Sequence, residues 1–316
     1  MSQADIIFKT MCEDILTNGC DTKGEKVRPH WEDGTPAYTI KKFGVVNRYN
    51  LAEEFPALTL RKTNIKAAVD EILWIWQKKS NNVNNLNSHI WDDWADENGS
   101  IGKAYGYQIG KQYVHHKYNT TNGVDSNIKV KDLSDYPSAE VIIDTINHQA
   151  LVYMDQIDGV IYDLRHNPYS RRIMTNIYNF SDLHEMGLYP CAYSMTFNVT
   201  KKEGHDKLIL NGILNQRSQD TLAANNWNVV QYSVLLHMIA QVCNMEVGEL
   251  VHCIADCHIY DRHVPAIKEL ISREPMEAPK FWINPEVKNF YDFTVDDIAL
   301  IDYNTHPQIK NIPVAI

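Results

Sequence analysis

Apolar residues recur along the chain with two different periods, which predicts a mixture of helices and strands. Apolar residues at helical spacing predict helices at 4–17, 64–79, 139–157 and 227–243. Extended apolar runs predict strands at 37–49, 173–178, 193–199, 207–214 and 251–260. The sequence has no internal repeat, low-complexity run or linker that marks a second domain, so we interpret 1–316 as one domain.

One predicted helix, 64–79, carries a carboxylate on its apolar stripe, at Glu71. Its helical neighbours at three and four positions are all apolar, namely Ala67, Ala68, Trp74 and Ile75. A carboxylate in this position either reaches the helix edge with its charged end in water or faces a functional site. The pattern leaves both interpretations open.

Residues 111–138 are polar and weakly patterned, and we interpret them as a surface excursion. The adjacent His115 and His116 have no partner at metal-ligand spacing, so we expect a solvated loop here. In the strand predicted at 251–260, histidines and cysteines alternate and therefore occupy opposite faces. A zinc site that used both sets would need both faces at once, so we predict no metal site.

Composition narrows the class of protein. The 316 residues carry a formal net charge of −10, which argues against general nucleic-acid binding through basic patches. No apolar run approaches the ~20 residues that span a membrane. The first 17 residues also lack the build of a signal peptide. Six cysteines in so long a chain favour reduced thiols, and we expect a cytoplasmic protein.

Chemically versatile side chains concentrate in residues 187–260. Cys191 follows Pro190 at a predicted turn into a strand, and a free thiol has a pKa of about 8.5. A guanidinium near it, such as that of Arg217, would raise the thiolate fraction. Spacing alone leaves open a buried structural thiol instead of a nucleophile.

Two further features allow more than one interpretation. Arg171 and Arg172 lie beside a predicted turn and could bind a phosphate or carboxylate, or be an ordinary solvated pair. In the helix at 227–243, Asn225 or Asn226 is expected to cap the first turn, and Asn228 falls within that turn.

Short segments along nearly the whole chain resemble the thymidylate synthase family. They lie, in order, at 34–36, 71–74, 90–99, 170–172, 190–191, 216–220, 228, 258–260 and 313–316. The resemblance implies an α+β single-domain fold, with a mixed β-sheet core flanked by helices and with sheets packed back to back in a homodimer. It implies a methyltransferase of nucleotide biosynthesis that converts dUMP to dTMP. The co-substrate would be 5,10-methylenetetrahydrofolate, which gives carbon and hydride and leaves as dihydrofolate, without any metal.

The resemblance also implies roles for individual residues. Cys191 would attack carbon 6 of uracil and form a covalent adduct, while Glu71 and Tyr105 would handle protons and Asn228 would read the uracil edge. Residues implied to bind dUMP are Arg28, Gln216, Arg217, Ser218, Gln219, Asp220, Asn228, His258 and Tyr260, with Arg171 and Arg172 from the neighbouring subunit. Residues implied to bind folate are Trp91, Trp94, Asp220, Ala315 and Ile316, and Arg217 and Asp220 would also assist catalysis.

Three places depart from the family pattern. Ala192 follows the implied nucleophile where many relatives have histidine, and Asn64 replaces a frequent folate-contacting histidine. The segment 223–227, Ala-Ala-Asn-Asn-Trp, replaces the usual Leu-Gly-x-Pro-Phe. Two alternative functions are therefore considered. One is a pyrimidine hydroxymethylase of the same superfamily, and the other is a non-catalytic nucleotide- or RNA-binding regulator.

Overall fold

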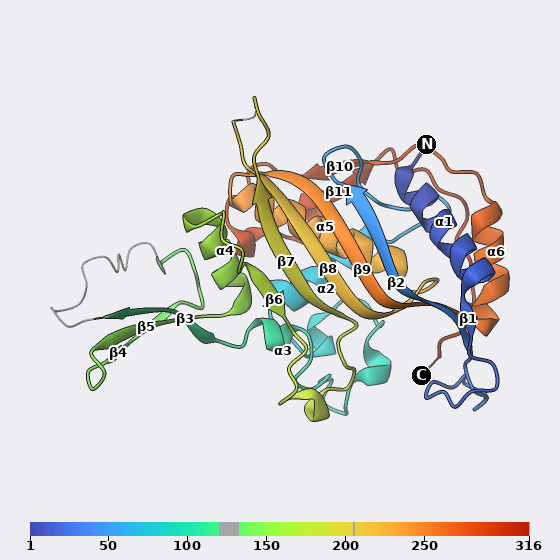
Figure 1. Cartoon of the computed structure of the whole chain (residues 1–316), viewed down its shortest axis with the longest axis horizontal. Coiled ribbons are helices and arrows are strands. Elements are labelled where there is room, and N and C mark those ends of the chain that lie inside the picture. The colour runs from blue at the N-terminus through green and yellow to red at the C-terminus, as the bar shows by residue number, and fades with distance from the viewer. Residues whose placement is uncertain (120–132, 205, 316) are drawn as a thin grey trace.

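A six-stranded mixed sheet forms the centre of the computed structural model, which describes residues 1–119, 133–204 and 206–315 (Figure 1). The strand order is β1-β2-β9-β8-β7-β6; β8 and β9 run parallel and the other neighbours antiparallel. These strands are β1 (Cys20–Asp21), β2 (Thr39–Asn50), β6 (Met174–Asn176), β7 (Ala192–Thr200), β8 (Ile209–Asp220) and β9 (Glu246–Tyr260). The five strands predicted from the apolar runs are confirmed, and so is the α+β class.

Helices pack against one face of this sheet. They are α1 (Gln3–Asn18), α2 (Ile65–Trp76), α3 (Gly106–Ile109), α4 (Gln156–His166), α5 (Asn225–Val242) and α6 (Val264–Ser272). The long helix α5 connects the parallel strands β8 and β9, because a parallel pair needs a crossover. Figure 1 shows α5 and α2 behind β7, β8 and β9, whose other face is open to the viewer.

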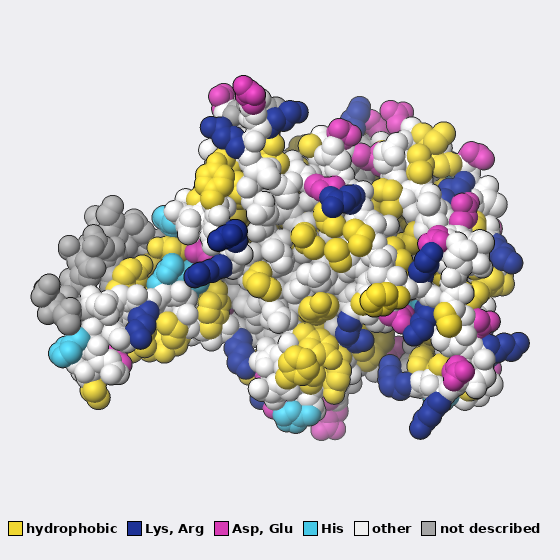
Figure 2. Space-filling view, viewed as in Figure 1, with side chains coloured by type: hydrophobic (Ala, Val, Ile, Leu, Met, Phe, Trp, Pro, Cys, Tyr) yellow, Lys and Arg dark blue, Asp and Glu magenta, His cyan; other side chains and the backbone are white. Residues whose placement is uncertain are grey.

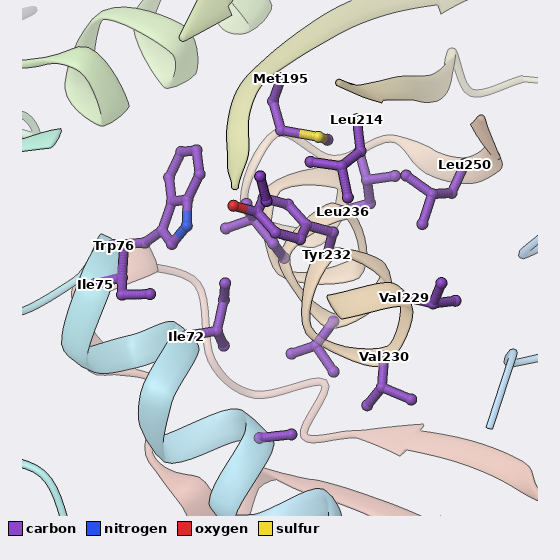
Figure 3. Packing of buried hydrophobic residues seen from close by; sticks show 14 of the residues in the cluster. Ile72, Ile75, Trp76, Met195, Leu214, Val229, Val230, Tyr232, Leu236 and Leu250 are labelled. Carbon is purple, nitrogen blue, oxygen red and sulfur yellow. The ribbon is translucent and has the colours of Figure 1, made fainter. Parts of the chain in front are cut away.

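The core lies between α2, α5 and the sheet. Ile72 and Trp76 of α2 face Tyr232 and Leu236 of α5, and strand residues such as Leu214 close the cluster (Figure 3). Each of these side chains is at least 96% buried. This packing holds α2 and the first turn of α5 against the ends of the central strands, where the chemically versatile residues lie.

The helix ends follow from local hydrogen bonds. Asn64 caps α2 by accepting a hydrogen bond from the backbone of Ala67, as expected for an N-cap asparagine. The prediction that Asn225 or Asn226 caps α5 is wrong, since Ala224 occupies that position without a side-chain cap. Both asparagines instead turn into the core: Asn226 Oδ1 accepts from Leu58 N, and Asn225 Nδ2 donates to a buried glutamine.

The prediction of a helix at 139–157 is wrong. Residues there form the hairpin β4 (Glu140–Asp144) and β5 (Gln149–Met154), and α4 begins only at Gln156. In β5, Ala150, Val152 and Met154 are buried at every second position, a strand period that a short apolar run does not separate from a helical one. Together with β3 (Tyr113–Asn119) this hairpin makes a second sheet of order β3-β5-β4.

The surface excursion predicted at 111–138 contains a regular element, because β3 lies inside it. Residues 120–132 of that segment lie outside the described residues. The remaining strands, β10 (Lys280–Ile283) and β11 (Ile298–Ile301), pair with each other. Short 3₁₀ turns occupy Val83–Asn85, Asp92–Trp94, Leu183–Glu185, Asp261–His263, Phe290–Asp292 and Val295–Asp297. A search of the described residues finds no helix with the length and apolar character to cross a membrane.

Candidate active site

The thiol of Cys191 lies where a loop enters β7, directly beside the guanidinium of Arg217. Arg217 Nη2 is 3.7 Å from Cys191 Sγ. The guanidinium is fixed by two further bonds, from Nε to Pro190 O at 3.0 Å and from Nη2 to Tyr189 O at 2.7 Å. Pairing of β7 with β8 adds a bond from Arg217 N to Cys191 O at 2.9 Å. The structure therefore brings together the thiol and arginine that the sequence placed 26 residues apart.

The pKa of Cys191 depends on two opposing effects, burial and the charge of nearby arginines. Burial raises the pKa of Cys191, and the positive charges of Arg217 and Arg28 oppose this without overcoming it. The predicted effect of Arg217 is therefore confirmed in its direction, but burial outweighs it and raises the pKa of the thiol.

Tyr105 lies against the same thiol loop. Its hydroxyl accepts a hydrogen bond from Cys191 N at 3.3 Å, and burial raises its pKa well above the usual range, so the phenol keeps its proton. The residue has φ 44° and ψ −103°, an unfavourable backbone region for a bulky side chain. Such strain persists where the surrounding structure imposes it, often at functional sites.

Glu71 is buried rather than at the helix edge, which settles the alternative left open by the sequence. It is 4% exposed, and its two oxygens accept hydrogen bonds from two indoles: Trp91 Nε1 to Oε1 at 3.1 Å and Trp227 Nε1 to Oε2 at 2.7 Å. Burial raises the pKa of Glu71, and the two indole bonds oppose that rise. Trp91 also contacts Tyr105 and Trp94, with ring centroids 4.7 and 5.8 Å apart.

Trp227 is a site residue that sequence reasoning missed. It ends the segment 223–227 that departs from the family pattern, and that departure was the available signal. Its contact with Glu71 joins residues 156 positions apart, on α5 and α2, and so depends on how the two helices pack.

A chain of amides fixes the side chain of Asn228. Gln216 Nε2 donates to Asn228 Oδ1 at 3.1 Å, and Asn228 Nδ2 donates to Gln231 Oε1 at 3.4 Å. His252 Nε2 lies 2.8 Å from Gln216 Oε1. Burial lowers the pKa of His252 to about 3, so this neutral ring donates to the glutamine oxygen and sets the orientation of the amides. His252 is a second residue that the sequence did not single out.

Asp220 connects the end of β8 to the C-terminal tail through His263. Its Oδ1 accepts from Leu222 N at 2.9 Å and lies 3.4 Å from His263 Nδ1. Burial acts to raise the pKa of Asp220, but His263 and neighbouring donors hold it below its usual value. His263 Nε2 in turn lies 2.8 Å from Pro313 O. Ala315 follows in the described chain, whereas Ile316 lies outside the described residues.

Two aromatic residues lie side by side at the end of β9. The rings of His258 and Tyr260 are 5.0 Å apart, and His258 Nδ1 is 2.8 Å from Asp256 Oδ1. Burial, with the charge of Asp220, raises the pKa of Tyr260 to about 12. Both side chains keep the shared face that strand alternation predicts.

The remaining predicted residues are more open to solvent. Arg28 is exposed, yet its charge acts on both Cys191 and Tyr260. Arg171 and Arg172 follow α4 and are exposed, and in the described part of the chain neither forms an ion pair. Hydrogen bonds and ring contacts thus link Cys191 to Tyr105, Trp91 and Glu71, and neither arginine takes part in these contacts among the described residues. Of the rest, Ser218 is half-buried on β8 and Gln219 is 1% exposed beside Gln216.

A half-buried thiol beside a fixed guanidinium, with a buried carboxylate and an oriented amide, is an arrangement typical of enzymes that use nucleophilic catalysis. The family model described as thymidylate synthase matches residues 6–316. The chain belongs to the thymidylate synthase family.

Individual relatives agree with this assignment over nearly the whole length. The chain is 41% identical over 307 residues to thymidylate synthase 1 of Bacillus subtilis (strain 168), and 42% identical over 307 residues to thymidylate synthase of Bacillus licheniformis. Each alignment covers 96% of this chain and 96% of the relative. Among solved structures, thermostable thymidylate synthase A from Bacillus subtilis is similar with a TM-score of 0.81 and 38% identity, covering 100% of both chains.

Proposed function

We propose that this protein is a thymidylate synthase, a methyltransferase that converts dUMP to dTMP. The co-substrate 5,10-methylenetetrahydrofolate supplies the carbon and the hydride and leaves as dihydrofolate. The observation that carries the proposal is the position of Cys191 Sγ, 3.7 Å from Arg217 Nη2, in a chain of this family. Reactive cysteines characteristically lie beside a positively charged side chain such as arginine.

Cys191 acts as the nucleophile toward carbon 6 of the uracil ring. Its proton passes to water as the sulfur–carbon bond forms, and the electron pair of the C5–C6 double bond moves toward O4, which makes carbon 5 an enolate-like nucleophile. Arg217 stabilises the thiolate and binds the substrate phosphate, for which a guanidinium fork is well suited. Because the unliganded thiol is protonated, proton removal accompanies the attack.

Glu71 and Tyr105 manage protons beside the ring. Burial raises the pKa of Glu71 toward the working pH, which favours general acid–base catalysis. Tyr105 keeps its hydroxyl proton and contacts the backbone of Cys191, so it can relay a proton near carbon 5.

Asn228 selects uracil over cytosine. Its side-chain amide offers one donor and one acceptor, which match the O4 and N3–H of uracil. Gln216 and His252 hold that amide in one orientation and so support the selection. His258 and Tyr260 bind the deoxyribose hydroxyl from the adjacent strand end.

The functional unit is a homodimer in which Arg171 and Arg172 complete the phosphate site of the partner subunit. Their exposure and lack of ion pairs in the described chain support this, as does the open face of the main sheet. Phe43 is 89% and Val46 54% exposed there, beside a hollow of about 180 Å³. Figure 2 shows apolar side chains across the strands of this face. Apolar surface of this kind is typical of an isologous interface, with sheets back to back.

Trp91, Trp94 and Asp220 bind the folate, and the tail with Ala315 and Ile316 closes over it. Closure would exclude water and protect the hydride transfer. The contact of His263 with both Asp220 and Pro313 supports a coupling between the pterin position and the tail.

Two further proposals concern the cell compartment and the number of domains. The structure describes all six cysteines and each is a free thiol, which favours a reducing compartment such as the cytoplasm. One continuous buried core supports a single domain over 1–316.

The test is incubation with dUMP and methylenetetrahydrofolate, followed by spectrophotometry and mass analysis of the nucleotide. We expect dihydrofolate and a nucleotide that gains CH2. The altered segment 223–227 favours one alternative, hydroxymethylation, which would add CH2O and yield no dihydrofolate. Folded protein that gives neither product would indicate a non-catalytic regulator.

A further inference from the structure

Three potential metal ligands converge where β3 meets α4, outside the candidate active site. His115 and His116 come from β3 and Asp163 from α4, and each offers one donor atom within 4.8 Å of the other two. Among the described residues, no other group of three His, Cys, Asp or Glu side chains meets that distance. The prediction of a solvated loop at His115 and His116 is wrong, because the side chain of His115 is only 7% exposed.

A β-bulge explains how two adjacent histidines share one side of a strand. Neighbouring side chains on a regular strand point to opposite faces. The register of β3 against β5 shifts between Val114 and His116, and such a shift redirects side chains. The rings of His115 and His116 are accordingly 4.3 Å apart, and both contact Tyr162 of α4, at 5.6 and 5.1 Å.

The surroundings orient His115 as metal ligands are commonly oriented. Tyr113 Oη lies 3.1 Å from Nδ1 of His115, and this leaves Nε2 directed at Asp163 Oδ1, 3.2 Å away. A hydrogen bond to the second ring nitrogen is a usual accompaniment of a metal-bound histidine. Gly159 permits this approach of α4, because a Cβ at that position would lie 2.4 Å from Tyr113 Oη.

His116 supplies an independent indication that a ligand is missing. Its Nε2 is buried and has no hydrogen-bond partner in the described part of the chain. Buried polar atoms in folded proteins nearly always have a partner, so an exception calls for an unseen group.

We propose that His115, His116 and Asp163 bind one divalent transition-metal ion, with Zn²⁺ the best match, and that the ion ties the β3-β5-β4 sheet to α4. Two imidazoles and one carboxylate suit zinc, with water in the fourth position. Zinc–ligand distances of ~2.0–2.2 Å require the three donors to move closer together than 4.8 Å, which side-chain rotation can provide. In the ion-free chain, the hydrogen bond between His115 and Asp163 holds the ligands near their positions.

The test is a titration of the full-length, metal-stripped protein with ZnCl2 in competition with a chromophoric chelator. We expect one ion per chain, bound at least about 10-fold more weakly after His116→Gln or Asp163→Asn. Tyr113→Phe should weaken binding by about 10-fold, a typical effect of losing a hydrogen bond to a ligand. His184→Gln is the matched control, since that side chain is 74% exposed and pairs with a neighbouring glutamate, and this variant should bind zinc like the wild type.

Cobalt and thermal melting separate this site from the six thiols. Bound Co²⁺ should give visible absorption without thiolate-to-metal charge-transfer bands, and Zn²⁺ should raise the Tm of the wild type but not of folded Asp163→Asn. The proposal is overturned by thiolate bands, by equal zinc affinity in the wild type and both ligand variants, or by no binding at micromolar zinc.

Discussion

Replacing Trp227 with phenylalanine would remove one of the two indole donors that hold Glu71 while keeping an aromatic ring on α5. The lost bond is 2.7 Å long, reaches a carboxylate that is 4% exposed, and favours its charged form. Hydrogen bonds to charged groups contribute ~1.5–3 kcal/mol. At 1.36 kcal/mol for each tenfold change, Glu71 should bind its proton roughly 10- to 100-fold more tightly in the variant.

The kinetic consequence is a pH profile of kcat displaced toward alkaline pH. Trp94→Phe is the matched control, because its ring contacts Trp91 at 5.8 Å and makes no hydrogen bond to Glu71 in the described chain. The KM for dUMP should change little, since Trp227 is assigned no contact with the nucleotide. A Trp227→Phe enzyme whose kcat–pH profile overlays that of the Trp94→Phe control would refute this role for the indole.

The pH dependence of the free energy of unfolding should also report the pKa of Glu71. The pKa of folded Glu71 lies above its unfolded value, so the unfolded chain binds fewer protons between those values. The free energy of unfolding therefore falls as pH rises through this window, and Trp227→Phe should extend the fall to higher pH. Urea denaturation at several pH values measures where the fall ends, and an end point at the same pH as in the wild type would contradict the assignment.

Three other perturbations test the remaining parts of the site. Arg171→Ala and Cys191→Ala should each lose turnover alone, but mixing them should restore part of it in hybrid dimers; no rescue after confirmed subunit exchange would exclude shared sites. His263→Gln should raise the KM for the folate several-fold and leave that for dUMP nearly unchanged, because it frees the tail from Asp220; equal effects on both would count against the coupling. Phe43→Asp should convert dimers to monomers in analytical ultracentrifugation, and a stable dimer would move the interface elsewhere.

Periodicity predicted most of the fold because the core helices and strands are long enough to reveal their apolar faces. Residues 139–157 were misassigned because a hairpin of short strands and a helix start share one apolar run. In that run the burial of Ala150 and Val152 at every second position is visible only in the structure. The capping prediction for α5 is wrong at Asn226, because its side chain accepts a hydrogen bond from Leu58 N instead of capping the helix.

Local motifs predict some residues of the site, whereas contacts between distant segments determine the others. The family resemblance could predict roles for Cys191 and Asn228 because their motifs are local. The bond between Trp227 and Glu71, and the approach of Asp163 to His115, join distant segments through helix packing and a β-bulge. A sequence without aligned relatives carries no signal for such contacts. Spacing likewise indicates the effect of Arg217 on the pKa of Cys191 but not the opposing effect of desolvation, which depends on the surrounding structure.

The central claim is that the sulfur of Cys191 bonds covalently to carbon 6 of the pyrimidine. Incubation with 5-fluoro-dUMP and methylenetetrahydrofolate tests it most directly, because fluorine at carbon 5 blocks the proton removal that would release the adduct. We predict that mass spectrometry of the digested protein finds both ligands on the peptide containing Cys191, and on no peptide of Cys191→Ala. Active enzyme that forms no adduct, or an adduct on another residue, would contradict the account.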